Sequence, residues 1–252
     1  MKLQNVIRFL IVAVPILLYE IAARQHWIDT FTFIPFTEMV ASAVTLLSES
    51  EFVKEHLLTT LLEMGLCFVI SVIGGIAIGF LLWRKEWLYY SIQPYLLLIY
   101  AVPLFALYPI FITFLGLGPQ SIISMAVLLA ITAVISNTTI GLLETKKVYE
   151  KVGQSLNMPL KKMLVYIYFP AAWPQIFTGL KLAVSYSIIG VLASEFILST
   201  EGLGYTIARA YNDFENNRMF GAILLVIAFS LTITLTLAIL DNLVYKKEVK
   251  GK

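Results

Sequence analysis

The chain has 252 residues, of which 59% are hydrophobic and only 13% are charged, and its net charge is +2. Soluble globular domains carry about 25% charged residues, so this composition excludes a soluble protein and indicates an integral membrane protein. The length suits five or six helical spans of about 20 apolar residues each, and helices are expected because lipid offers no hydrogen-bond partners to an open backbone.

The N-terminal part predicts one membrane span followed by a polar connection. Residues 6–23 are mainly apolar and predict the first span. Because a basic residue, Lys2, precedes this run, a cleaved signal peptide is the alternative, but Glu20 lies inside the run and no convincing cleavage site follows it. Residues 24–62 are more polar and predict an extramembrane segment with a helix near 37–48.

Three further apolar stretches predict spans at 64–83, 175–198 and 219–240. Gly75 and Gly79 lie four residues apart in the first of them. This spacing allows another helix to approach closely, although glycine is also simply common in membrane helices.

The region between these stretches predicts two spans and a turn. No charged residue occurs over 87–143, which is too long for a single span. The turn signal Gly116-Leu117-Gly118-Pro119 divides it. The division predicts spans near 92–115, which contains three prolines, and near 120–142.

The predicted spans and connections group into three parts of the chain. Residues 1–55 hold the N-terminal transmembrane helix and an extracytoplasmic connection, 56–245 form the main transmembrane domain, and 246–252 form a basic tail. Lysine and arginine gather near both termini, after residue 83 and in 144–174. By the positive-inside rule, both termini and 144–174 are expected in the cytoplasm.

A short amphipathic helix is predicted at 147–156 in this cytoplasmic segment. Val148, Val152 and Leu156 recur every four residues and form one apolar stripe. Such a helix can lie on the lipid surface, held by its apolar stripe and its lysines, or it can dock on another protein. Periodicity alone leaves both interpretations open.

A second helix is predicted to follow at a sharp corner. Asn157 readily takes the left-handed conformation that ends a helix, and Pro159 suits the first turn of the next one. Lys161 and Lys162 make this second helix basic, and Pro170 is expected to interrupt it.

Motifs for nucleotide or metal binding are absent from the sequence. There is no Gly-x-x-x-x-Gly-Lys-Ser/Thr loop, so the chain has no such cradle for ATP. Cys67 is the only cysteine, and His26 and His56 lack the spacing of metal ligands. An intramembrane enzyme is therefore a poor interpretation.

The predicted cytoplasmic corner resembles the loop signature of bacterial ATP-binding cassette (ABC) importer permeases. The resemblance rests on Lys151-Val-Gly-Gln-Ser-Leu-Asn157 followed by Ile167-Tyr-Phe-Pro170. The departures are at Lys151, Val152, Asn157 and Phe169, where that family usually has Glu, Ala, Gly and Leu. Asn and Phe keep the local chemistry, whereas Lys151 removes any salt bridge made by the usual Glu.

Flanking motifs resemble the nitrate, sulfonate, taurine and thiamine-precursor permease subfamily, and the resemblance covers about 56–245. They are Tyr108-Pro109-Ile-Phe111, Asn137-Thr-Thr-Ile-Gly141, Phe169-Pro-Ala-Ala-Trp-Pro174, Phe177-Thr-Gly-Leu-Lys-Leu-Ala183, Ala193-Ser194-Glu195 and Gly202-Leu-Gly-Tyr205. The resemblance implies an all-α integral membrane protein with about six transmembrane helices, of the type I ABC importer permease fold, with a cytoplasmic coupling helix.

The resemblance also implies partners and a site. A separate ATPase would bind ATP and Mg²⁺, this chain would bind no cofactor, and the permease would work with an extracytoplasmic substrate-binding protein and a second permease copy in the bacterial inner membrane. No nucleic acid is expected. The residues expected to couple to the ATPase are Lys151, Gly153, Gln154, Ser155, Leu156, Asn157 and Pro170.

Three polar or aromatic residues are candidates for the pathway or its gate: Asn137, Glu195 and Tyr108. The structural alternatives are a hydrogen bond across helices for Asn137 and aromatic packing for Tyr108. For Glu195 the alternative is an interfacial position with a partner in 202–205.

Two other functions stay open at this point. An ion-coupled secondary transporter would use Glu195 or Glu63, but no repeated halves are visible in the sequence. A membrane scaffold is supported only by the lipid-surface interpretation of 147–156. The substrate of an importer is expected to be a small nutrient of the sulfonate, nitrate, taurine or vitamin-precursor class.

Overall fold

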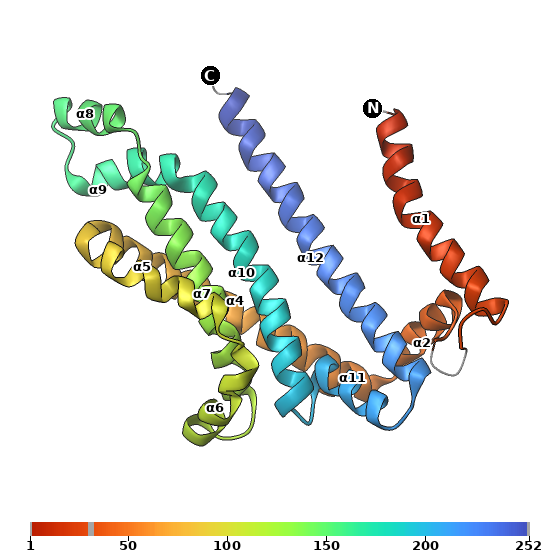
Figure 1. The fold of residues 1–252 in the computed structure, drawn as a ribbon. Helices are drawn as coiled ribbons and strands as arrows, with labels where there is room; N and C mark the ends of the chain where they lie inside the picture. The colour runs from red at the N-terminus through yellow and green to blue at the C-terminus, as the bar shows by residue number, and fades with distance from the viewer. Residues whose placement is uncertain (1, 30–32, 251–252) are drawn as a thin grey trace.

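The computed structural model describes residues 2–29 and 33–250, and the regular elements in these two ranges are all helical (Figure 1). The predicted all-α fold is therefore confirmed. The elements in chain order are α1 (Lys2–Arg24), α2 (Phe36–Ser48), α3 (Ser50–Phe52), the π-helical η1 (Val53–Leu57), α4 (Leu58–Arg84), α5 (Glu86–Ala101), the 3₁₀-helical η2 (Leu104–Leu107), α6 (Tyr108–Leu115), α7 (Pro119–Leu143), α8 (Lys147–Ser155), α9 (Leu160–Met163), the π-helical η3 (Leu164–Tyr168), α10 (Phe169–Leu198), α11 (Gly202–Asn212) and α12 (Asn216–Lys250).

Within the described ranges, four helical runs are long and apolar enough to cross a membrane. They are Ser50–Arg84, Pro119–Leu143, Leu160–Leu198 and Asn216–Ile239. Helix α1, with 23 residues, also has the length of a span. These five helices correspond to five of the six predicted spans, and the chain is a multi-pass membrane protein.

Helix α7 forms the centre of the bundle, between α4 and α10. Its Ala126 and Val134 are fully buried. A methyl group on Gly75 would come within 2.5 Å of Cβ of Val134, and one on Gly79 within 2.8 Å of Cβ of Thr138. The two glycines therefore let α4 approach α7 closely, as their spacing predicts.

The prediction of a single span over 92–115 is wrong. Helix α5 ends at Ala101, and Val102 is extended, with φ −76° and ψ 125°. Pro103 follows, and a proline disfavours the helical conformation in the residue before it. The segment therefore divides into α5 and α6, which is only eight residues long.

The predicted turn after α6 is confirmed. Gly116 and Gly118 have φ values of 79° and 131°, which residues with a side chain rarely adopt. Pro119 then begins α7 at a position where its missing N–H costs nothing.

The predicted interruption at Pro170 is also wrong, because one helical run continues from Leu160 to Leu198. The five residues before Phe169 form η3, a π-helical turn that is wider than an α-helical turn. Proline lacks an N–H and crowds the carbonyl one turn back. The wider turn accommodates Pro170, so the helix passes through it.

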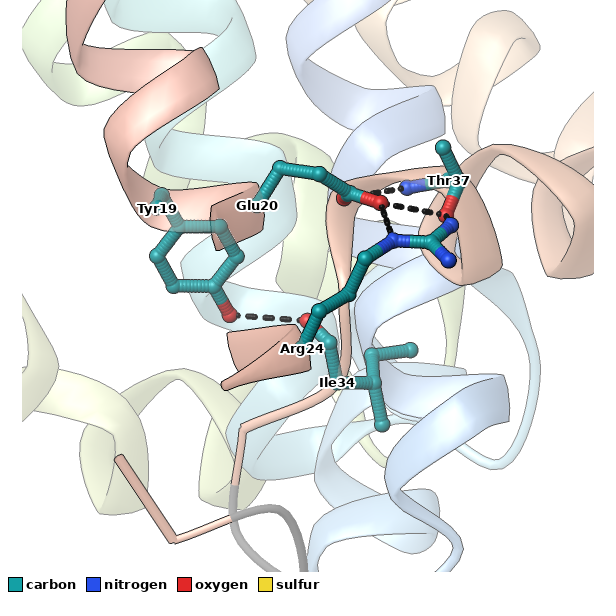
Figure 2. Close-up of polar contacts among 5 residues, drawn as sticks. All are labelled: Tyr19, Glu20, Arg24, Ile34 and Thr37. Carbon is teal, nitrogen blue, oxygen red and sulfur yellow. Dashed lines mark hydrogen bonds and ion pairs between the residues drawn. The ribbon is translucent and has the colours of Figure 1, made fainter. Parts of the chain in front are cut away.

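Polar side chains join α1 to α2, as Figure 2 shows. Glu20 accepts hydrogen bonds from Nε of Arg24 at 2.5 Å and from Oγ1 of Thr37 at 2.9 Å. The hydroxyl of Tyr19 donates to the carbonyl of Ile34 at 2.9 Å. Helix α2 in turn packs on α12, so these bonds attach α1 to the bundle through α2.

The two chain ends and α8 lie at one end of the bundle, whereas α2, α6 and α11 lie at the other end (Figure 1). This arrangement agrees with the predicted common side for both termini and the 144–174 segment.

Candidate coupling site

Helix α8 presents an apolar stripe away from the rest of the chain. Val148, Val152 and Leu156 expose 65%, 50% and 67% of their surface, respectively. An exposed row of apolar side chains normally marks a surface that binds another protein or a membrane. The predicted amphipathic helix is thus confirmed, and its apolar face is available to a partner or to lipid.

The opposite face of α8 is seated on the start of the long Leu160–Leu198 helix. Gly153 is buried there, and a methyl group on it would come within 2.7 Å of Cδ1 of Ile167 and 3.2 Å of Cε of Met163. A larger residue at this position would therefore push α8 off Met163 and Ile167. We call Gly153, Met163 and Ile167 the α8 seat.

A helix-ending motif fixes the corner after α8. Asn157 has φ 51°, as predicted for its left-handed conformation. The N–H of Asn157 donates to the carbonyl of Gln154 at 2.9 Å, and the N–H of Met158 donates to the carbonyl of Gly153 at 3.0 Å. This pair of bonds is the Schellman arrangement, which satisfies the last carbonyls of a helix. Asn157 therefore adopts the left-handed conformation at the position where the importer-permease loop signature usually has Gly.

A hydrogen-bonded and aromatic chain connects α8 to α4. The hydroxyl of Tyr168 donates to Oε1 of Glu150 at 3.1 Å. The Tyr168 ring meets Trp83 of α4 edge-on, with ring centroids 4.7 Å apart. Helix α8 thus contacts the long Leu160–Leu198 helix directly and α4 through Tyr168.

The remaining residues expected at the coupling site lie at the surface. Lys151, Gln154, Ser155 and Asn157 are exposed on α8 or just after it. Pro170 is exposed on α10, shortly after the π-helical turn and apart from the α8 helix itself. Exposed Lys161 and Lys162 add positive charge near the corner. The exposed set therefore lies on the surface of the corner, whereas Gly153 is buried in the α8 seat.

The three pathway candidates lie in different surroundings. Nδ2 of Asn137 donates to the carbonyl of Ala133 in its own helix at 2.9 Å. Tyr108 is partly exposed at the start of α6. Glu195 is fully buried within the protein, and it has the expected partner, because the N–H of Gly204 donates to its Oε2 at 2.8 Å. The structure does not bring the three side chains together.

Sequence reasoning missed the residues under α8. Met163, Glu150 and Tyr168 form part of the seat or link it to α4, but no role was predicted for them, and Ile167 was noted only as a residue of the signature. The one available signal is the spacing between Gly153 and Ile167 in the resembling signature.

Comparison with known proteins agrees with this architecture. The profile of the family described as "Binding-protein-dependent transport system inner membrane component" matches residues 71–248. A probable ABC transporter permease protein of Haemophilus influenzae is 29% identical over 92% of this chain and 93% of its own length.

Two relatives have named substrates. The formylaminopyrimidine transport permease protein ThiX of Halalkalibacterium halodurans is 28% identical over 83% of this chain and 82% of its own length. The nitrate import permease protein NrtB of Synechocystis is 28% identical over 77% of this chain and 71% of its own length. This chain therefore belongs to the family of binding-protein-dependent transport system inner membrane components, the transport permeases of ABC importers.

Proposed function

We propose that this permease is driven through α8 by a separate ATPase subunit that docks on the stripe formed by Val148, Val152 and Leu156. A second permease copy completes the pathway, and an extracytoplasmic binding protein delivers the substrate. Both chain termini and α8 face the cytoplasm in the inner membrane. The observation that carries the proposal is the two-faced packing of α8, exposed and apolar on one side and seated at Gly153 on the other.

The seat explains how a push on α8 reaches the membrane. Met163 and Ile167 belong to the same helical run that continues to Leu198, and Tyr168 links the corner to Trp83 of α4. Both of these long helices pack on the central α7. A displacement of α8 is therefore passed to the two helices that enclose the centre of the bundle.

The substrate proposed is a small polar nutrient, either a small anion such as nitrate or a sulfonate, or a vitamin precursor. Support comes from the relatives, whose names refer to formylaminopyrimidine and nitrate. Selectivity in such a system would rest largely with the binding protein. The ligand that co-purifies with the binding protein encoded beside this permease would identify the substrate.

Replacing Val152 by Asp tests the docking surface. A charge in the apolar stripe should prevent the ATPase from co-purifying with the permease and abolish uptake, while an exposed position leaves the permease folded. Leu117→Asp is the matched control, because Leu117 is 74% exposed in the turn between α6 and α7, at the opposite end of the bundle. Equal loss of the ATPase in both variants, or in neither, would count against the proposal.

Energy coupling separates an importer from an ion-coupled carrier. In proteoliposomes containing the permease, its ATPase and its binding protein, uptake should stop when ATP is withheld and continue when the proton gradient is collapsed. The reverse pattern would support the carrier. Uptake that is unaffected by deletion of the permease would support a scaffold.

A further inference from the structure

Distant side chains cap the N-terminus of α11 at the end of the bundle opposite α8. The first N–H groups of a helix have no partner within that helix, so other groups must satisfy them. Here the bonds are Gly202 N–H to Nδ1 of His56 at 3.1 Å, Leu203 N–H to Oγ1 of Thr60 at 2.8 Å, and Gly204 N–H to Oε2 of Glu195 at 2.8 Å. Residues of η1, α4 and α10 therefore fix the point where α11 begins.

Glu195 serves this junction as a hydrogen-bond acceptor on both oxygens. The hydroxyl of Thr60 donates to Oε1 at 2.6 Å, and the N–H of Gly204 donates to Oε2. A methyl group on Gly202 would come within 2.4 Å of Cδ of Glu195, so the backbone of α11 closes directly over the carboxyl group. An acceptor-only group in this position is the ionised carboxylate.

Glu63 approaches the same carboxylate from α4. It lies one helical turn after Thr60, which bonds to Glu195, it is 3% exposed, and its Oε2 is buried with no hydrogen-bond partner among the described residues. Two carboxyl groups form a hydrogen bond only if one of them carries a proton. An ionised carboxylate that is buried without a partner is costly, and Glu195 already accepts from two donors, so the proton shared by such a pair belongs to Glu63.

We propose that Glu63 is a neutral carboxylic acid in the folded permease and donates its proton to Glu195, so that one buried proton holds α4, α10 and α11 together at this end of the bundle. This proton is structural and is not transported. The proposal stands apart from the docking of an ATPase on α8.

Other charged groups border the junction from each neighbouring element. Those acting on the two carboxyl groups or on His56 are Glu51 and Glu55 before α4, Glu201 before α11, and Arg218 of α12. A glutamate exposed to water is ionised at neutral pH, so folding takes up a proton at Glu63. The contribution to stability is therefore greatest in acid, below the pH at which an exposed glutamate ionises, and it falls as the pH rises, because ionised Glu63 would face ionised Glu195.

Amide substitutions test the assignment, since they mimic only the neutral acid. The Glu63→Gln amide can still donate to Glu195, whereas Glu195→Gln turns its N–H₂ group toward one of two donors, Thr60 or Gly204, and leaves that donor without an acceptor. Glu195→Gln should lower the Tm of the purified permease by roughly 4–10 °C, and Glu63→Gln should lower it by less than about 2 °C. Glu63→Gln should also remove the decline of Tm that the unaltered protein shows in alkaline buffer.

The opposite order of Tm values, equal losses, or an unchanged alkaline decline in Glu63→Gln would overturn the proposal. Glu201→Gln is a control for the pH dependence, because it removes a neighbouring charge and leaves the hydrogen bond between Glu63 and Glu195.

Infrared spectroscopy gives a direct second measurement on the full-length permease. A protonated carboxylic acid has a carbonyl stretching band that is separate from those of carboxylates. We expect such a band at neutral pH, its loss in Glu63→Gln, and its retention in Glu20→Gln, which alters a partly buried carboxylate paired with Arg24. Absence of the band at neutral pH, or an unchanged band in Glu63→Gln, would contradict the assignment. Neither measurement needs the ATPase, so failure here and failure of the importer proposal are distinguishable.

Discussion

Replacing Gly153 by valine should lift α8 from its seat while the bundle stays folded. A methyl group alone would come within 2.7 Å of Ile167 and 3.2 Å of Met163. Overpacking of this kind destabilises by about 1–3 kcal/mol, and the higher helix propensity of valine relative to glycine offsets roughly 0.4 kcal/mol of this. Because α8 is a short peripheral helix, we expect it to move rather than the core to unfold.

The displaced helix should bind the ATPase more weakly. If about 1–2 kcal/mol of the strain must be overcome on docking, the affinity for the ATPase falls by about fivefold to thirtyfold. The assay is ATPase binding to the permease in nanodiscs, followed by ATP-driven uptake in proteoliposomes. Thermal unfolding of the same sample checks that the bundle remains intact.

A compensating substitution makes this test specific to the seat. Ile167→Ala removes the nearest atom that Gly153→Val would meet and leaves the looser contact with Met163, so the double variant relieves most of the overlap. Residues in contact show coupling energies of about 0.5–3 kcal/mol, so the double variant should recover much of the lost affinity. Additive losses, or full affinity in Gly153→Val alone, would refute the role of the seat.

Three further predictions concern other parts of the chain. Asn157→Ala should lower stability by about 1–2 kcal/mol in thermal or chemical unfolding, because alanine is disfavoured in the left-handed conformation, whereas Asn157→Gly should be nearly neutral; equal effects would be contrary to this reasoning. Lys181→Asp should weaken the attachment of α12 to α10, since Nζ of Lys181 lies 2.9 Å from Oδ2 of Asp241, but by less than about 1 kcal/mol because both side chains are about two-fifths exposed. The exchange Lys181→Asp with Asp241→Lys should restore the unfolding temperature, and a double variant worse than either single one would argue against the pair.

Local patterns predicted much of the fold. The apolar stretches, the turn at Gly116 and the stripe around Val152 depend on neighbours in sequence, and the structure confirms them. The close approach at Gly75 and Gly79 followed from the size of glycine alone.

The errors occurred at prolines. Pro103 divides the expected third span, whereas Pro170 does not interrupt its helix because a π-helical turn precedes it. Both outcomes depend on the conformation of the preceding residues, which composition and spacing do not specify.

Long-range contacts could not be predicted from one sequence. Gly153 was expected among the ATPase contacts, but the fold places it against Met163 and Ile167. Glu63 and Glu195 are far apart in the chain, and only the packing of α4 and α10 on α7 brings them to one junction, where Thr60 bonds to Glu195. From the sequence, the two glutamates were named together only as alternative coupling residues of an ion-coupled transporter, not as residues that share a site.

The central claim is that a cytoplasmic ATPase contacts α8, and site-specific crosslinking tests it most directly. The sequence contains one cysteine, Cys67, which is fully buried. A crosslinking reagent should therefore react with the exposed cysteine introduced as Val152→Cys. In inverted membrane vesicles containing the complete transporter, a bifunctional reagent should join this cysteine to the ATPase subunit, with a yield that changes when ATP is added. The account is contradicted if no ATPase adduct forms from Val152→Cys, or if an impermeant reagent labels that cysteine from outside intact cells.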